Sequence, residues 1–88
     1  MQIRDMKMED YGISEARSKE LMELARLEEN RDVLEMAANA SNDYLAKYLI
    51  VSLSRKRAGF RTLFKYEAFL PCTKNDFYAY RRRTLAFF

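Results

Sequence analysis

The scarcity of residues that bend or stop a chain most constrains what this sequence can fold into. The 88 residues include only two glycines and one proline, which is too few for the turns of a many-stranded sheet. Helix-favouring Glu, Lys, Arg, Leu, Ala and Met are abundant instead. Hydrophobic residues make up 49% of the chain and aromatic residues 14%, which suffices for one small core. We therefore predict a single all-α domain of about five helices.

Histidine and cysteine, two residue types that commonly catalyse reactions or bind zinc, are nearly absent. The chain has no histidine and one cysteine, Cys72, so the commonest general base and a thiol–imidazole pair are both missing. Clusters of Cys or His that bind zinc and a glycine-rich phosphate loop are missing too. We expect no enzymatic activity, no metal and no cofactor. A lone cysteine favours a reducing compartment, and no apolar run approaches the roughly 20 residues that cross a bilayer, so we expect a cytoplasmic protein without membrane contact.

The first two thirds of the chain should form a helical support. Residues 1–12 lack periodicity and are expected to be a loose arm, followed by the support over 13–58. Ser14 is a suitable N-cap for a first helix of about 13 residues. Apolar residues at helical spacing predict a second helix over 31–40 and a third over 43–57. The core side of the second helix should comprise Val33, Met36, Ala37 and Ala40.

Residues 60–88 are typical of two helices joined by a tight turn. The first should cover 61–69 and end before Pro71, because the residue before a proline avoids helical geometry. Thr73 is the expected N-cap of the last helix, which begins at Lys74. The core side of this last helix should comprise Phe77, Tyr80, Thr84, Leu85 and Phe88. Cys72, in the turn, should be a small buried apolar residue.

Positive charge is concentrated in the C-terminal part of the chain. The net charge is +3, but residues 54–88 hold nine bases and two acids, a net +7, which leaves −4 for residues 1–53. Such a separation favours a polyanion as the partner of the C-terminal part. The alternative is a solvated basic face that has no partner.

Residues 62–88 resemble the conserved part of bacterial sigma-factor region 4. The run Asp76–Arg83 is also similar to the end of small phage and mobile-element transcription regulators with sigma-like helix-turn-helix domains, and Asp10–Ser14 is similar to their start. Glu67 departs from the small residue usual where the two helices cross. The positions that keep the apolar and capping pattern of region 4 are Leu63, Tyr66, Leu70, Cys72, Thr73, Phe77, Tyr80, Leu85 and Phe88.

The resemblance implies that the last helix, 74–88, enters the major groove of duplex DNA. Its exposed early positions would then contact bases: Lys74, Asn75, Tyr78 and Ala79. A lysine amine suits guanine O6 or N7, and an asparagine amide suits adenine. The cations expected to contact DNA phosphates are Arg55, Lys56, Arg57, Arg61, Lys65, Arg81 and Arg82.

These observations predict a sequence-specific DNA-binding regulator of transcription from a phage or mobile element. Its expected partners are double-stranded DNA and, as further candidates, RNA polymerase and a second copy of the chain. One alternative is a protein-interaction module, an anti-activator or RNA polymerase-binding factor, that docks its basic last helix on an acidic protein surface. Another is the DNA-binding part of a packaging protein.

Overall fold

The computed structural model describes residues 3–55 and 72–88, whose regular structure is entirely helical. The four α-helices of these residues are α1 Glu15–Ala25, α2 Arg31–Asn42, α3 Ala46–Ser54 and α5 Lys74–Phe87. Three short 3-10 helices accompany them, η1 Ile3–Asp5, η2 Met8–Tyr11 and η3 Glu28–Asn30. The prediction of an all-α chain is confirmed, although the described residues contain four α-helices rather than five. The helix expected over 61–69 lies outside the described residues.

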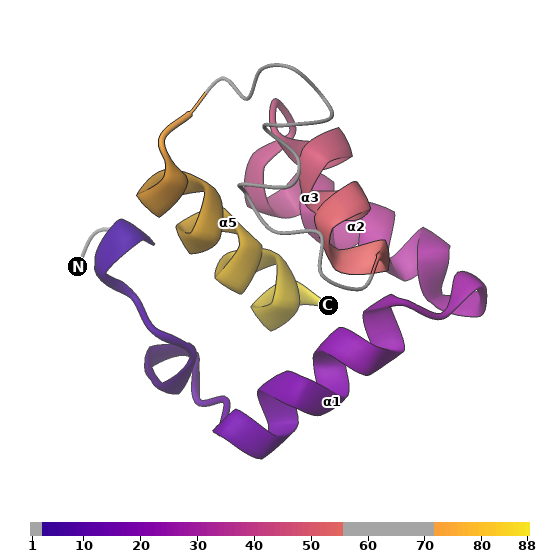
Figure 1. Cartoon of the computed structure of the whole chain (residues 1–88), viewed down its shortest axis with the longest axis horizontal. Coiled ribbons are helices and arrows are strands. Elements are labelled where there is room, and N and C mark those ends of the chain that lie inside the picture. The colour runs from indigo at the N-terminus through magenta and orange to yellow at the C-terminus, as the bar shows by residue number, and fades with distance from the viewer. Residues whose placement is uncertain (1–2, 56–71) are drawn as a thin grey trace.

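Helix α5 is central to the arrangement and contacts α1, α2, α3 and the N-terminal segment (Figure 1). Two hydrophobic clusters lie along it. The first contains Ala38, Leu45, Ala46, Leu49 and Phe77, and the second contains Leu21, Ala25, Leu34, Leu53 and Leu85. One large side chain of α5 enters each cluster, so burial of apolar surface fixes this helix at two points along its length.

Helix α1 begins where the sequence predicts. The Ser14 hydroxyl accepts a hydrogen bond from the Arg17 amide at 3.1 Å, which satisfies one of the unpaired donors of the first turn. Leu21 and Ala25, one turn apart, are buried. The helix ends at Ala25, two residues before the expected end at Leu27, which is 44% exposed.

The prediction for the core side of α2 is confirmed for Ala37 but wrong for Val33, Met36 and Ala40, which are exposed. Val33 is 47% exposed and Met36 is 74% exposed. Small residues decide which side of this helix is buried, because they allow a close approach to α5. The Ser41 hydroxyl, for example, donates to the Tyr80 main-chain carbonyl at 3.0 Å. The residues of α2 that are buried are Leu34, Ala37, Ala38 and Ser41.

Helix α3 is shorter than the expected 43–57. The Asn42 side-chain carbonyl accepts hydrogen bonds from the amides of Tyr44 at 3.0 Å and Leu45 at 3.1 Å. An asparagine that bonds the backbone two and three residues ahead favours a turn over a continuing helix. Residues 43–45 therefore form a turn, and the helix begins at Ala46.

The predicted start and inner side of α5 are largely confirmed. The Thr73 hydroxyl accepts a hydrogen bond from the Asp76 amide at 3.2 Å, as expected of an N-cap. Phe77 and Thr84 are 0% exposed and Leu85 is 3% exposed. The remaining expected core residues, Tyr80 and Phe88, are half-buried against the two hydrophobic clusters.

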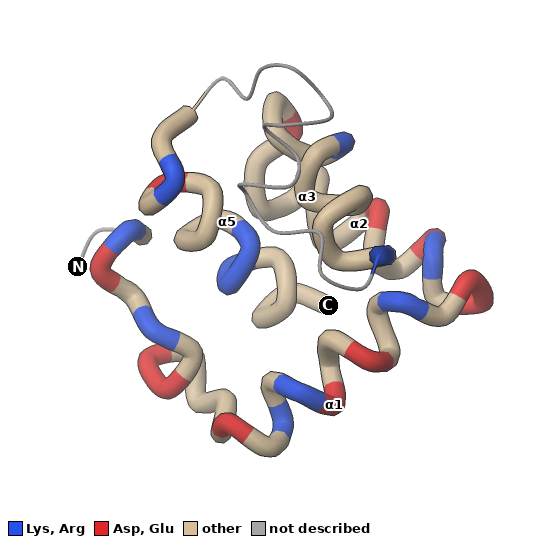
Figure 2. The backbone as a smooth tube through the Cα atoms, in the orientation of Figure 1, with Lys and Arg blue, Asp and Glu red and all other residues tan. Residues whose placement is uncertain are grey.

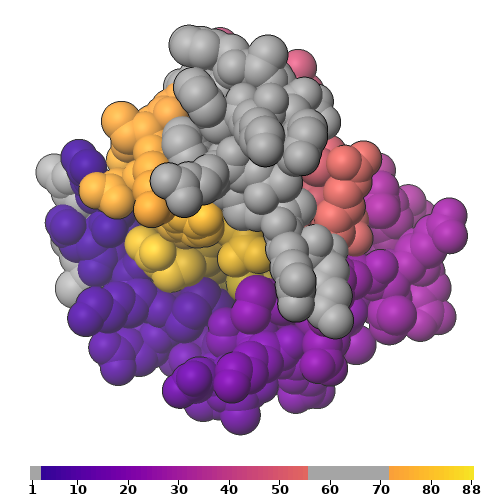
Figure 3. Space-filling view, viewed as in Figure 1, coloured from indigo at the N-terminus to yellow at the C-terminus, as the bar shows by residue number. Residues whose placement is uncertain are grey.

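The N-terminal segment is not the loose arm that the sequence predicts. Residues 3–11 form η1 and η2, and η1 lies against α5 (Figures 1 and 3). The Arg82 Nε–H donates to the Met6 carbonyl at 2.7 Å. Within the segment, the Lys7 amide donates to the Asp10 carboxylate at 2.8 Å, and Gly12 ends η2 with a left-handed φ of 76°. Order in this segment comes from contacts with α5, which local periodicity does not encode.

Candidate nucleic-acid interface

Two of the four residues expected to contact bases lie open on the first turn of α5. Lys74 and Asn75 are exposed. Tyr78, one turn further on, is half-buried, and its ring meets the Phe77 ring edge-on at 5.7 Å between centroids. The first turn of α5 therefore exposes the Lys74 amine and the Asn75 side-chain amide next to the half-buried Tyr78 ring.

Ala79 is the exception among these four residues, because it is 1% exposed. Arg4 of η1 contacts the residues of α5 that flank Ala79. Its Nε lies 3.6 Å from the Asp76 carboxylate, and its carbonyl accepts a 3.5 Å hydrogen bond from Arg82. Asp76 and Arg82 stand three residues before and after Ala79, on one side of the helix. Because Ala79 is buried, it is not placed to contact a base, and that prediction is wrong.

Arg81, expected to contact a phosphate, is directed into the protein. Its Nε–H donates to the Ser52 hydroxyl at 3.0 Å, and one terminal nitrogen lies 3.9 Å from the Met22 sulfur. Burial lowers the pKa of this guanidinium from its ordinary value, while Tyr78 acts weakly in the opposite direction. Arg81 therefore joins α5 to α1 and α3, and these contacts do not support the expected phosphate contact.

Arg82, also expected to contact a phosphate, makes hydrogen bonds within the chain through part of its guanidinium. Its Nε and one terminal nitrogen donate to the carbonyls of Met6 and Arg4, at 2.7 Å and 3.5 Å. The guanidinium is half-buried and holds the N-terminal segment against α5. The next arginine of the run, Arg83, lies over the Phe87 ring at 5.0 Å. Arg82 and Arg83 therefore both form contacts within the chain.

The other expected phosphate contacts are only partly within the described residues. Arg55 is exposed just after α3, where the chain becomes extended. Four further expected contacts lie outside the described residues: Lys56, Arg57, Arg61 and Lys65. Figure 2 shows acids and bases interspersed along α1, whereas α5 carries a basic position near its start and a block of basic positions in its middle.

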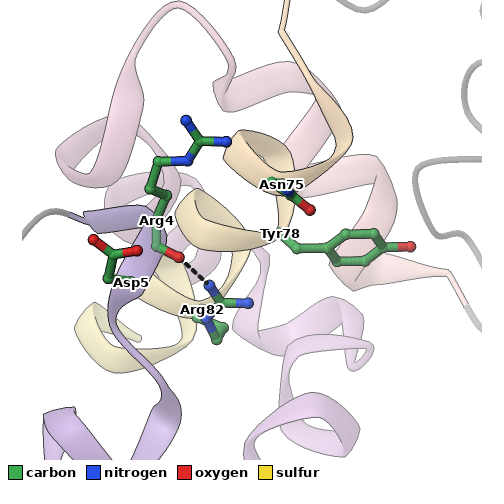
Figure 4. Close-up of a pocket in the computed structure, with 5 residues that line it drawn as sticks. All are labelled: Arg4, Asp5, Asn75, Tyr78 and Arg82. Carbon is green, nitrogen blue, oxygen red and sulfur yellow. Dashed lines mark hydrogen bonds between the residues drawn. The ribbon is translucent and has the colours of Figure 1, made fainter.

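A polar cleft of about 500 Å³ opens between η1 and the first half of α5. Its lining residues are Arg4, Asp5, Asn75, Tyr78 and Arg82 (Figure 4). The α5 residues of this lining follow the helical spacing i, i+3 and i+7, so the cleft runs along one side of the helix. No local sequence pattern points to Arg4 and Asp5, because they reach the cleft through the fold of the N-terminal segment.

Cys72, at the start of the turn into α5, is half-buried and packs against the Phe77 cluster. Burial raises the pKa of its thiol, and the negative charge of Asp76 raises it further. The thiol is therefore less often ionised than an ordinary cysteine, which suits a packing role better than a nucleophilic one.

Comparison of the chain with family models, with curated proteins and with solved structures finds no match. The helix-turn-helix expected over 60–88 is described only from Cys72 onward, which covers the Thr73 cap and α5. None of the helices in residues 3–55 and 72–88 is long and apolar enough to cross a membrane. The same residues contain no group of acidic or cysteine side chains placed to hold a metal ion.

Proposed function

We propose that this chain binds duplex DNA in a sequence-dependent manner and regulates transcription, with the first turn of α5 in the major groove. The observation that carries the proposal is the exposure of Lys74 and Asn75 on a helix start that Thr73 caps and Phe77 anchors. Lysine and asparagine are suited to the major-groove edges of guanine and adenine. A helix N-terminus also favours a nearby phosphate.

The origin in a phage or mobile element and the role in transcription rest on the resemblance of residues 62–88 to sigma-like regulators. RNA polymerase is a partner that this resemblance makes reasonable. A second copy of the chain has less support than the sequence suggested, because Leu85 is buried and Phe88 packs against the second hydrophobic cluster. Of the two C-terminal aromatic residues, Phe88 is half-buried within one chain and Phe87 is 47% exposed.

Fluorescence anisotropy with a labelled random duplex, followed through a series of salt concentrations, tests the proposal. We expect micromolar affinity that falls steeply with salt, with a slope of about −0.9 in log K against log salt for each neutralised phosphate. Selection from a random duplex library should then return a preferred site. Absence of binding at low salt would overturn the proposal.

Variants separate base contacts from general electrostatics. Lys74→Ala and Asn75→Ala should change the preferred site, because each removes a group suited to a base edge. Lys19→Ala is the matched control for Lys74→Ala, since Lys19 is an exposed lysine on α1, with its amine 3.7 Å from the Glu15 carboxylate. It should leave the preferred site unchanged. An unchanged site in all three variants would contradict the assignment of α5 to the major groove.

A protein-interaction module is the second candidate, and the observation that favours it lies on α2 rather than on the basic last helix. Val33 and Met36 are open on the outer side of α2, and Tyr44, in the following turn, is 72% exposed. Asp32 and Glu35 lie beside them and are exposed as well. Exposed apolar side chains gathered on one side of a helix mark protein contacts more often than nucleic-acid contacts. Absence of duplex binding at low salt would favour the protein-interaction module.

A further inference from the structure

We infer that the cleft between η1 and α5 binds one phosphate group of the DNA backbone, with Arg4 and Arg82 supplying its positive charge. The inference rests on the proposed DNA binding and adds to it a site that includes the N-terminal segment. The cleft residues come from opposite ends of the sequence, and η1 brings Arg4 beside the first half of α5 (Figure 4).

Hydrogen-bond donors dominate the lining of the cleft. Arg4 and Arg82 contribute guanidinium groups, and Asn75 contributes an amide. Guanidinium donors match the geometry of phosphate oxygens and bind them as charge-assisted pairs. The one carboxylate of the lining, on Asp5, lies on the opposite side of Arg4 from Tyr78 in Figure 4. The lining therefore holds two guanidinium groups against one carboxylate, and this balance of charge favours an anion.

Arg82 provides a positive charge that carboxylates of the described residues do not neutralise. Its hydrogen bonds within these residues go to main-chain carbonyls, from Nε to Met6 and from one terminal nitrogen to Arg4. A guanidinium has five N–H donors, so these two bonds leave three for a ligand. A half-buried cation bound only to neutral oxygens attracts an anion more strongly than a solvated cation, because less water screens it.

Arg4 can turn to a phosphate at little cost. Its ion pair with Asp76 is long, at 3.6 Å, and both side chains are largely open, at 50% and 39% exposure. Exposed ion pairs of this kind contribute little to stability. A phosphate in the cleft would thus compete for Arg4 with one exposed carboxylate.

The position of the cleft fits a backbone contact beside a base contact. Asn75 lines the cleft and also lies on the exposed first turn of α5, next to Lys74. Phosphate contacts fix the register and orientation of a protein on the duplex while base contacts carry the sequence preference. A phosphate held by Arg4 and Arg82 would set how deeply the first turn enters the groove.

The inference is tested by measuring the affinity of Arg4→Ala and Arg17→Ala for random duplex over the same series of salt concentrations. Arg17 is a close match, since its side chain is 51% exposed and its Nη1 lies 2.9 Å from the Glu20 carboxylate. Both variants lose one positive charge, so their general electrostatic effect is the same. We expect Arg4→Ala to weaken binding about tenfold and to reduce the salt slope by about 0.9, with an unchanged site preference. Arg17→Ala should leave slope and affinity within error of the original chain.

A duplex probe tests the phosphate itself. In the selected site, single phosphates are replaced one at a time by uncharged methylphosphonates. At one position the substitution should weaken binding of the original chain more than binding of Arg4→Ala, because the variant keeps only the Arg82 contact with that phosphate. If Arg4→Ala does not fold, Arg4→Lys replaces it, and the loss at that position should be smaller than in the original chain. Equal salt slopes for the two alanine variants, or equal losses at every methylphosphonate position, would overturn the inference. Absence of duplex binding by the original chain would instead overturn the proposed function.

Discussion

The two halves of α5 differ in charge and in how their polar side chains are used. In the first half, 74–80, Lys74 and Asn75 are open to solvent. In the second half, 81–87, Arg81 and Arg82 form hydrogen bonds with Ser52 and with the carbonyls of the N-terminal segment. The cations that look most suited to DNA in the sequence are thus the ones that hold the protein together.

The difference follows from the length and chemistry of arginine. Its apolar stem can pack along a neighbouring helix while the guanidinium reaches a hydroxyl or carbonyl on another element. The middle of a central helix in a small domain offers such acceptors on several sides, whereas its first turn does not. A basic run in a helix is therefore a weaker sign of DNA contact than a basic or amide residue on an exposed, capped first turn.

The largest expected effect comes from the anchor of the first half. Phe77→Ala should lower the free energy of unfolding by about 3–5 kcal/mol, because it empties a site that is 0% exposed. Urea unfolding followed by circular dichroism measures the change. Tyr44→Ala, at a 72% exposed position, is the control and should change stability by less than about 0.5 kcal/mol. Similar values for the two variants would contradict the anchored start of α5.

The next effect separates neighbouring arginines of the second half. Arg81→Ala should cost about 2 kcal/mol, since it removes a charged donor from Ser52, which is 0% exposed. Arg83→Ala should cost about 0.5–1 kcal/mol, the range for a cation over an aromatic ring. Urea unfolding followed by circular dichroism measures the loss of stability in both variants. An equal or smaller loss in Arg81→Ala would mean that its contacts stabilise nothing beyond those of an ordinary surface residue.

A smaller effect concerns the cap on which the exposed first turn depends. Thr73→Ala should lower the free energy of unfolding by about 1 kcal/mol, because the Asp76 amide loses its acceptor. Thr73→Ser keeps the hydroxyl and should retain most of the stability. If the serine variant loses as much as the alanine variant, the hydroxyl is not what stabilises the helix start.

The smallest effect is a pH dependence at Cys72. Because the folded chain holds the thiol proton more tightly than the unfolded chain, the free energy of unfolding should fall as pH rises above the ordinary thiol pKa of 9.0. The rate of alkylation against pH should accordingly have a midpoint above that of the urea-unfolded chain. Asp76→Asn should lower the midpoint only in part, since burial is the larger cause. A midpoint equal to that of the unfolded chain would contradict the half-buried thiol.

Local signals in the sequence predicted the parts of the fold that depend on neighbouring residues. The caps at Ser14 and Thr73 involve hydrogen bonds across three residues, and the inner side of α5 follows from the spacing of Phe77, Thr84 and Leu85. These features need no knowledge of the rest of the chain.

Long-range contacts decided what the sequence did not predict. The apolar residues of α2 lie on both sides of the helix, and contact with α5 selected the side with Ala38 rather than the side with Met36. The bond between Arg82 and Met6 joins residues 76 positions apart, so neither the ordered N-terminal segment nor the cleft was visible in local patterns. Of the candidate site, the exposure of Lys74 and Asn75 was expected and the part played by Arg4 was not.

The central place of α5 has a consequence for how the chain is made. Because Phe77 and Leu85 complete the two hydrophobic clusters, the segment 1–55 leaves the ribosome with leucines that have no helix to cover them. Synthesis runs from the N-terminus and domains generally fold as units, so this domain should gain its full structure only after α5 has been made. Until then a nascent chain of this kind presents the sort of surface that chaperones bind.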